Sequence, residues 1–162
     1  MNLIKFIKKE IVKISFRNKI SNVLKKAYEQ ESNELIIHNN GKLVRDGGSL
    51  FKIENEVVDG IYLRRMILNK GASVISGVHK RDHVWFLLQG HITVASENGT
   101  EEFVAPYVGF SKAGTQRAIY ANENSIFQNV FKNPNDFVDL DDLENYNYCS
   151  NIKEFKAYKK NK

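Results

Sequence analysis

GASVISGVHKRDHVWFLLQG, residues 71–90, is the stretch that decides the fold. It begins and ends with glycine, and residues 84–88 are all β-branched, aromatic or aliphatic, which is typical of a short strand between turns. His79 and His83 are four residues apart, so on an extended strand their side chains point to the same face, together with Arg81 and Trp85. The stretch therefore predicts a strand whose inner face carries two imidazoles.

The same alternation continues on both sides of this stretch. Asn98–Gly99 is a strong signal for a type I′ hairpin between two alternating runs. The strand-like runs outside the deciding stretch cover residues 57–68, 91–96, 100–105, 107–111, 117–121 and 125–131. Short strands separated by turn residues predict a small antiparallel barrel or sandwich.

Length and composition exclude several classes of protein. The chain of 162 residues is long enough for one domain, and its 42% hydrophobic and 27% charged residues exclude wholesale disorder. No apolar run approaches the ~18 residues that a membrane-spanning helix needs. The single cysteine, Cys149, excludes an intramolecular disulfide and a cysteine-rich zinc module. The first residues do not form a secretory leader, so we expect a cytosolic, reducing environment.

The amino-terminal segment, residues 1–30, is basic and amphipathic. Apolar residues recur at helical spacing, as at Ile7, Ile11 and Ile14. The segment contains seven lysines and one arginine but only two glutamates. Such a helix can lie on an anionic membrane or on nucleic acid, or it can be a docking or oligomerisation helix whose lysines face water. The candidate interaction residues are Lys5, Lys8, Lys9, Lys13 and Arg17.

The remaining organisation follows from changes of pattern. Residues 31–56 are predicted to connect the helical segment to a barrel over residues 57–133. Beyond Pro134 the spacing returns to that of a helix, with Pro134 in its first turn, and residues 134–162 are predicted to form this short helix and a basic tail.

Residues 71–90 also match the glycine spacing of a known sequence motif. Gly71, Gly77, His79, His83 and Gly90 resemble the first motif of the cupin superfamily. In this resemblance Gly77 stands where the first metal-binding histidine would be, His79 matches the second, and His83 replaces a glutamate. The resemblance implies a mainly β chain that forms a small cupin barrel, a double-stranded β-helix of jelly-roll type.

The second cupin motif is met only in part. Of the motif positions, the glycine is matched by Gly114, and Arg117 stands where the last metal-binding histidine belongs. More narrowly, residues 62–133 resemble small cupin-like proteins encoded by tailed bacteriophages, in pieces such as Gly77-Val-His-Lys and Ala113-Gly-Thr-Gln-Arg. This likeness implies a phage origin, a location in the host cytoplasm or the virion, and virion proteins as candidate partners.

Three interpretations of the barrel interior stay open. A divalent metal could sit on His79 and His83, but no acidic residue is in register, and the Arg117 cation would repel the metal by ~4 kcal/mol at ~4 Å and an effective dielectric of ~20. The sequence therefore favours no resident cofactor. A carboxylate, phosphate or sugar phosphate would suit Arg117 and the imidazoles better. The third interpretation is that these groups only hydrogen-bond one another as structural residues.

For an anion pocket, the sequence proposes further wall residues and two alternative functions. The full set of pocket candidates is Tyr62, His79, Arg81, His83, Trp85, Arg117 and Tyr120. The favoured function is a non-enzymatic ligand-binding or assembly module with a degenerate metal site. The alternative is a metal-dependent cupin enzyme of isomerase, epimerase or dioxygenase type that acts on a small or sugar-derived substrate.

The outward face of the deciding strand predicts association. If His83 and Trp85 face inward, then Val84, Phe86 and Leu88 face outward as an apolar stripe. We expect either the amino-terminal segment or a second copy in a dimer or ring to cover it.

Overall fold

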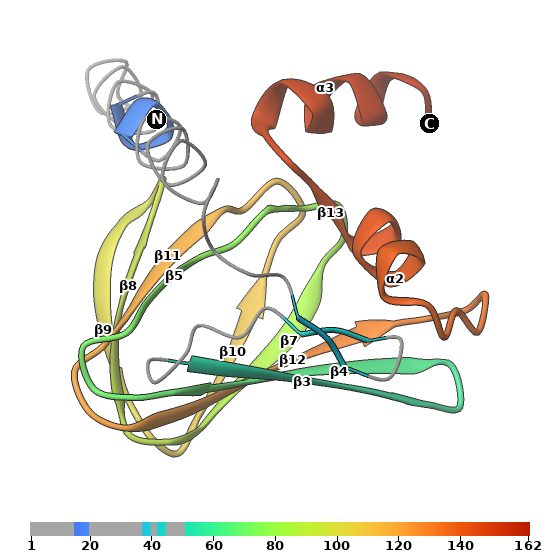
Figure 1. Cartoon of the computed structure of the whole chain (residues 1–162). Coiled ribbons are helices and arrows are strands. Elements are labelled where there is room, and N and C mark those ends of the chain that lie inside the picture. Colours follow the sequence, from blue (N-terminus) through green and yellow to red (C-terminus); the bar gives the residue numbers. More distant parts are fainter. Residues whose placement is uncertain (1–14, 20–36, 40–41, 45–50) are drawn as a thin grey trace.

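The structure is a computed structural model that describes residues 15–19, 37–39, 42–44 and 51–162, and the side chains of 15–19 and 51–162. Two antiparallel sheets face each other and enclose the core (Figure 1). The larger sheet has the order β10-β7-β12-β4-β3, and the smaller has the order β5-β11-β8-β9. The prediction of a mainly β, jelly-roll-like barrel is confirmed.

The strands of the larger sheet are β3 (Phe51–Val58), β4 (Ile61–Leu68), β7 (His83–Gln89), β10 (Tyr107–Ser111) and β12 (Ser125–Lys132). Those of the smaller sheet are β5 (Ser73–Ile75), β8 (His91–Ser96), β9 (Gly99–Val104) and β11 (Arg117–Ala121). Two short pairs complete the strands: β1 (Ile37–Asn39) with β2 (Lys42–Val44), and β6 (Val78–His79) with β13 (Tyr148–Cys149).

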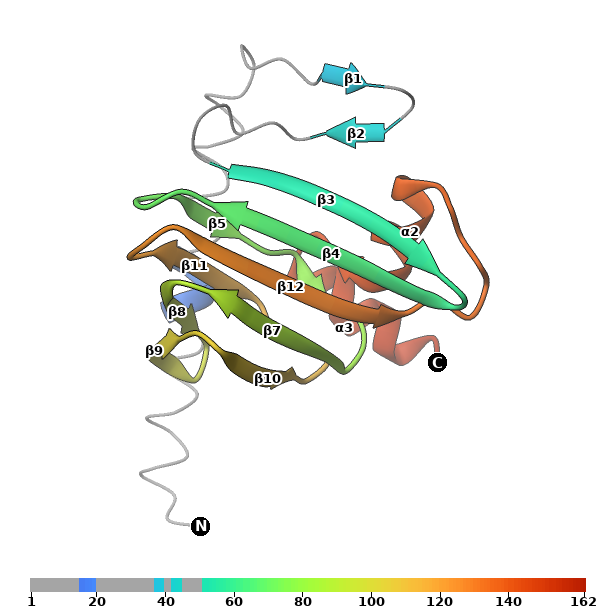
Figure 2. The same ribbon diagram turned by 90° about the horizontal axis from the view of Figure 1, so that it is seen from below.

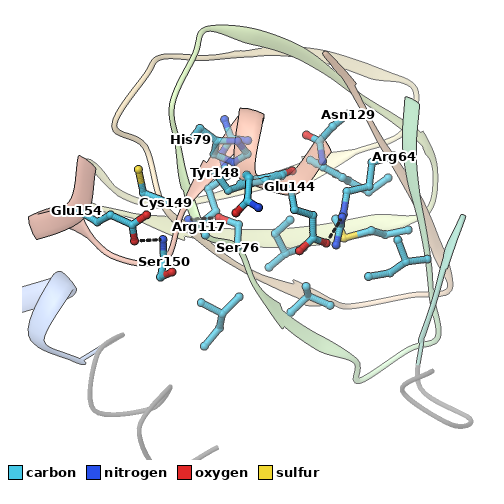
Figure 3. A pocket seen from close by; sticks show the side chains of 18 residues that line it. Arg64, Ser76, His79, Arg117, Asn129, Glu144, Tyr148, Cys149, Ser150 and Glu154 are labelled. Atoms are coloured by element: carbon cyan, nitrogen blue, oxygen red, sulfur yellow. Dashed lines mark hydrogen bonds and ion pairs between the residues drawn. The ribbon is translucent and has the colours of Figure 1, made fainter. Parts of the chain in front are cut away.

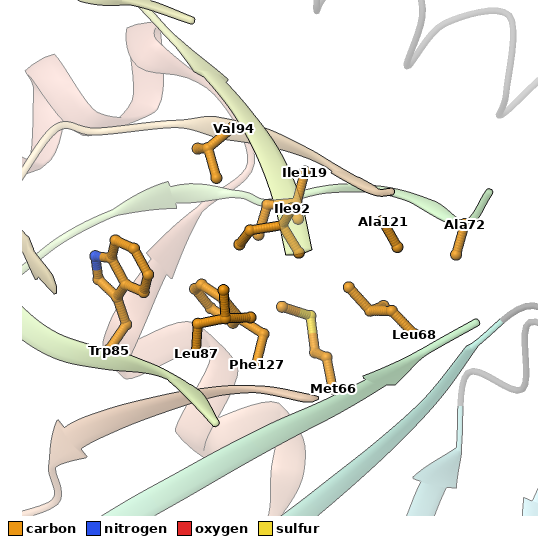
Figure 4. Packing of buried hydrophobic residues seen from close by; sticks show 10 residues of the cluster. All are labelled: Met66, Leu68, Ala72, Trp85, Leu87, Ile92, Val94, Ile119, Ala121 and Phe127. Atoms are coloured by element: carbon orange, nitrogen blue, oxygen red, sulfur yellow. The ribbon is translucent and has the colours of Figure 1, made fainter. Parts of the chain in front are cut away.

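The core lies between the two sheets (Figure 4). Alternate side chains of each strand are buried, as at Leu87 on β7, Ile92 on β8 and Phe127 on β12. Removing this apolar surface from water is the main force that holds the sheets together. The buried apolar cluster comprises Met66, Leu68, Ala72, Trp85, Leu87, Ile92, Val94, Ile119, Ala121 and Phe127.

The barrel begins earlier than predicted. β3 pairs along its whole length with β4, so the predicted boundary at residue 57 falls inside the first barrel strand. The single run predicted over residues 57–68 is interrupted by a tight hairpin turn at Asp59 and Gly60, whose φ angles are +42° and +72°. Two consecutive residues with positive φ are the signature of a type I′ turn, for which Asp-Gly is a preferred sequence.

The hairpin predicted at Asn98–Gly99 is present between β8 and β9. Its two loop residues are Glu97 and Asn98, because Ser96 pairs with Gly99. The turn therefore lies one residue earlier than the sequence signal suggested.

A C-terminal arm, defined here as residues 140–160, covers one end of the barrel (Figure 1). It consists of α2 (Leu140–Asn147), β13 and α3 (Ile152–Lys160). Asp139 caps α2 by accepting hydrogen bonds from two backbone N–H groups, so the prediction that Pro134 opens this helix is wrong. The predicted basic tail is α3, which begins after the capping residue Asn151.

Only a short part of the predicted amino-terminal helix falls within the described residues. Residues 15–19 are helical, and Arg17 forms an ion pair with Glu97, with 3.8 Å between Nη2 and Oε1. The lysines predicted to interact with partners, Lys5, Lys8, Lys9 and Lys13, lie outside the described residues. No helix in the described residues has both the length and the hydropathy that a bilayer crossing requires.

Candidate functional site

Two imidazoles lie side by side inside the barrel. His79 ends β6 and His83 begins β7, and both are buried, with 2% and 6% of their surface exposed. Their ring centres are 4.2 Å apart, and the Phe131 ring lies 4.6 Å from His83. The predicted convergence of the two histidines is therefore present, although a bend at residues 80–82 separates the two strands.

Burial keeps both imidazoles neutral. It lowers the pKa of His79 well below the ordinary value, with a further contribution from His83 and Arg117. Burial likewise lowers the pKa of His83 to about 4. A neutral imidazole has one donor and one acceptor nitrogen. Within the described residues, Nδ1 of His79 has no hydrogen-bond partner, whereas the side chain of Asn129 acts on His83 and raises its pKa against the effect of burial.

Arg117 is a buried cation without a carboxylate partner at ion-pair distance in the described residues. Its residue surface is 7% exposed, and the guanidinium donates a hydrogen bond to Oγ of Ser111. The backbone of Arg117 is fixed by a 3.0 Å hydrogen bond from its N–H to Oγ of Ser76. Burial lowers the pKa of Arg117 to about 10, so the side chain remains charged at neutral pH, and Glu97 acts on it from a longer distance.

A cavity of about 270 Å³ lies between the sheets and the C-terminal arm (Figure 3). Its apolar lining comprises Ile53, Met66, Val74, Ile75, Ile119 and Phe127. Its polar wall includes His79, Arg117 and Asn129 from the barrel, and Glu144 and Tyr148 from the arm. Such a cavity suits a small molecule with an apolar part and a polar or charged head.

A second guanidinium, which the sequence analysis did not nominate, reaches this cavity. Arg64 donates to Oε1 of Glu144 at 2.8 Å and to the hydroxyl of Tyr62 at 3.2 Å. Burial alone would lower the pKa of Arg64, but Tyr148, Tyr62 and Glu144 outweigh it and raise the pKa. The available signal was its position on the same face of β4 as the buried Tyr62 and Met66.

The position that a first metal-binding histidine would occupy is closed by the C-terminal arm. A Cβ atom on Gly77 would lie 3.0 Å from the carbonyl oxygen of Cys149 and 3.2 Å from Cβ of Tyr148. Tyr148 also packs on His79, with 4.9 Å between ring centres.

The residues present do not fit a divalent metal well. His79 and His83 offer two imidazole rings, but Arg117 adds a fixed positive charge beside them. Among the described residues, no group of three or more His, Cys, Asp or Glu side chains could hold a metal ion. A metal site normally needs three or four such donors.

Other predicted pocket residues lie elsewhere. Tyr120 is 47% exposed and faces solvent, so its prediction as a wall residue is wrong: Arg117 faces inward, and a residue three positions further along a strand must face outward. Arg81 lies outside the cavity as well. Because the chain bends at residues 80–82, its guanidinium donates to the carbonyl of Tyr146 and stacks 3.5 Å from the centre of that ring.

Tyr62 and Trp85 are buried but do not line this cavity. The hydroxyl of Tyr62 donates to Oδ1 of Asn55 at 2.6 Å and accepts a hydrogen bond from the guanidinium of Arg64. Trp85 lines a second cavity of about 230 Å³, between Phe103, Tyr107 and Arg117. Arg117 therefore stands between the two cavities.

Comparisons with known proteins concern the barrel. No family model and no curated protein matches the chain. Among solved structures, the chain is similar to KdgF from Halomonas sp., with 14% identity, a TM-score of 0.48 and coverage of 61% of this chain and 94% of that one. It is also similar to an RmlC-like cupin from Shewanella frigidimarina, with 14% identity, a TM-score of 0.47 and coverage of 62% and 92%. The likeness is one of fold, and it carries nothing about ligand or reaction.

Proposed function

We propose that this chain is a cupin-like, non-enzymatic ligand-binding protein whose cavity takes a small anion bearing a carboxylate or phosphate group. The observation that carries the proposal is Arg117, a buried guanidinium with no carboxylate at ion-pair distance in the described residues. A buried charge is costly unless it is paired, and a carboxylate or phosphate accepts hydrogen bonds from a guanidinium in a matching geometry.

The surroundings of Arg117 support an anion. His79 lies on the same cavity and is neutral, so it can offer one N–H donor without adding charge. Arg64 supplies a second guanidinium to the lining of the cavity, and Glu144 pairs with it. The apolar lining of the cavity would accept the hydrocarbon part of an organic anion, so a carboxylic acid or a sugar phosphate fits better than an inorganic ion.

The low pKa of the histidines supports binding rather than catalysis. An efficient general base has a pKa near the working pH, whereas the pKa of His83 is about 4 and that of His79 is well below its ordinary value. Both imidazoles are therefore weak bases, suited to donating or accepting a hydrogen bond.

The test uses Trp85, the only tryptophan in the chain, which lies under Arg117. Its fluorescence is followed during titration with succinate, glucose 6-phosphate and inorganic phosphate. We expect saturable binding of at least one organic anion, weakened tenfold or more in Arg117→Gln because a charged hydrogen bond is lost. Arg65→Gln is the matched control, since Arg65 faces outward to Gln128 and Glu54. Absence of binding, or equal loss in both variants, would refute the proposal.

One observation favours a second candidate, a metal-dependent cupin enzyme acting on a small or sugar-derived substrate. The rings of His79 and His83 lie 4.2 Å apart, and imidazole nitrogens are common metal ligands. Metal analysis of the purified protein separates the two functions. Stoichiometric Zn, Fe, Mn or Ni that is lost in a His79→Ala/His83→Ala variant would support the enzyme and contradict the anion site.

The phage origin and the virion or assembly role stay predictions, as does contact of the amino-terminal segment with nucleic acid or membrane. They rest on the sequence resemblance and on lysines outside the described residues. Co-purification of the full chain with phage particles, compared with a variant in which Lys5, Lys8, Lys9 and Lys13 are replaced by glutamine, would test them.

A further inference from the structure

The two edges of the larger sheet differ in charge. β10 forms one edge, with β7 as its only neighbour in the described part of the sheet (Figure 2). Its sequence, Tyr-Val-Gly-Phe-Ser over residues 107–111, contains no charged side chain. Its outward side chains are exposed apolar groups, since Val108 is 50% and Phe110 is 77% exposed. β10 is thus an uncharged, apolar strand, and one of its sides has no partner strand among the described residues.

The opposite edge is protected. β3 carries Lys52, Glu54 and Glu56 at alternating positions, and the β1–β2 hairpin lies beyond it (Figure 2). Charged side chains and covering segments are the usual means by which a sheet edge is kept from pairing with another chain. Within one sheet, this protection is therefore present at β3 and missing at β10.

We propose that β10 pairs antiparallel with β10 of a second copy of this chain, about a two-fold axis at Gly109. In that register Val108 of each copy lies opposite Phe110 of the other, and both face outward. A β-branched residue opposite an aromatic residue is a favourable cross-strand pair. The pairing also gives backbone partners to the outer side of β10, which has none among the described strands, and it joins two five-stranded sheets into one.

The charges next to β10 are compatible with this register and select a second copy as occupant. Lys112, the nearest charged residue that follows the strand, would lie opposite Pro106 of the other copy rather than opposite another lysine. Lys112 also forms an ion pair with Asp82, with 2.7 Å between Nζ and Oδ2. A two-fold interface must complement itself, and the outward pattern of β10 does.

The test measures the mass of the full chain in solution by light scattering over a range of concentrations. We expect a dimer of about twice 18.6 kDa for the unchanged chain, and loss of the dimer in Val108→Lys. Val58→Lys is the matched control, because Val58 is also 50% exposed and lies on the opposite edge strand. The control should remain a dimer.

A second variant tests the register and does not depend on the lysine variant folding well. Val108→Cys/Phe110→Cys should form a covalent dimer under mild oxidation, and Cys149 should give no background because it is 1% exposed. The proposal is overturned if the unchanged chain is a monomer. It is equally overturned if Val58→Lys dissociates the dimer as Val108→Lys does, or if the double cysteine variant does not cross-link.

Discussion

The guanidinium of Arg117 lies over the ring of Trp85, 5.3 Å from the ring centre. The two residues belong to different sheets, so this cation–π contact crosses the barrel and partly replaces the water that a buried cation loses. It also places the only indole of the chain against the group that we propose binds the ligand.

Replacing Arg117 with methionine should separate binding from stability. Removing a buried charge that has no carboxylate at ion-pair distance in the described residues should raise the free energy of unfolding by about 1 kcal/mol, or about 2–4 °C in Tm, while anion binding is lost. Thermal unfolding of both proteins without ligand measures this. A clear drop in Tm would mean that the hydrogen bond to Ser111 and the contact with Trp85 outweigh the cost of burial.

The free energy of unfolding should fall as the pH drops from 6.5 to 4. In this window the unfolded chain takes up protons on histidines whose pKa is lowered in the folded protein, so acid favours unfolding. His83 alone, with a pKa of about 4, corresponds to about 3 kcal/mol. Denaturant unfolding at several pH values measures it. The loss should be much smaller in His79→Gln/His83→Gln, and an unchanged profile would contradict neutral buried imidazoles.

Glu144→Gln should strengthen anion binding. Glu144 pairs with Arg64 at 2.8 Å and so competes with a ligand for that guanidinium. Without the carboxylate we expect affinity to rise about threefold to tenfold, or about 0.7–1.4 kcal/mol. Trp85 fluorescence titration measures it, with Asp142→Asn as a control on an exposed position of the same helix. Weaker binding would show that Glu144 serves the ligand by positioning Arg64.

Gly109→Ala should be strongly destabilising. A Cβ atom at this position would lie 2.1 Å from the Trp85 ring, which is buried and cannot move freely. We expect a loss of about 3 kcal/mol or more in the free energy of unfolding, as for severe overpacking. Gly99→Ala is the control: no atom lies within 4 Å of its added Cβ, so only the cost of its positive φ, about 1 kcal/mol, should appear.

Local patterns predicted most of the fold and part of the site. Alternation predicted strands over residues 57–68 and 84–88, and the structure buries Met66, Leu68 and Leu87 there, because a strand that covers a core must alternate. The same argument brought His79 and His83 to one face, and the resemblance to the second cupin motif added Arg117. The prediction for Arg81 was wrong because a bend interrupts the strand at residues 80–82. The prediction for Tyr120 was wrong because Arg117 faces inward, and a residue three positions further along a strand faces the other side.

The rest of the site comes from distant parts of the chain. Arg64 and Glu144 are 80 residues apart, and Tyr148 reaches His79 only because β13 pairs with β6. No periodicity within a strand or helix reveals which segment covers the mouth of a barrel. The contribution of the C-terminal arm to the cavity therefore required the structure.

The fit of the arm against Gly77 limits how this barrel could change. A Cβ atom at position 77 would lie 3.0 Å from the carbonyl oxygen of Cys149 and 3.2 Å from Cβ of Tyr148, so any side chain there needs the arm to shift by a few tenths of an ångström. A histidine at position 77 is therefore at odds with the arm as it is docked here, and a three-histidine site would need compensating changes in the arm.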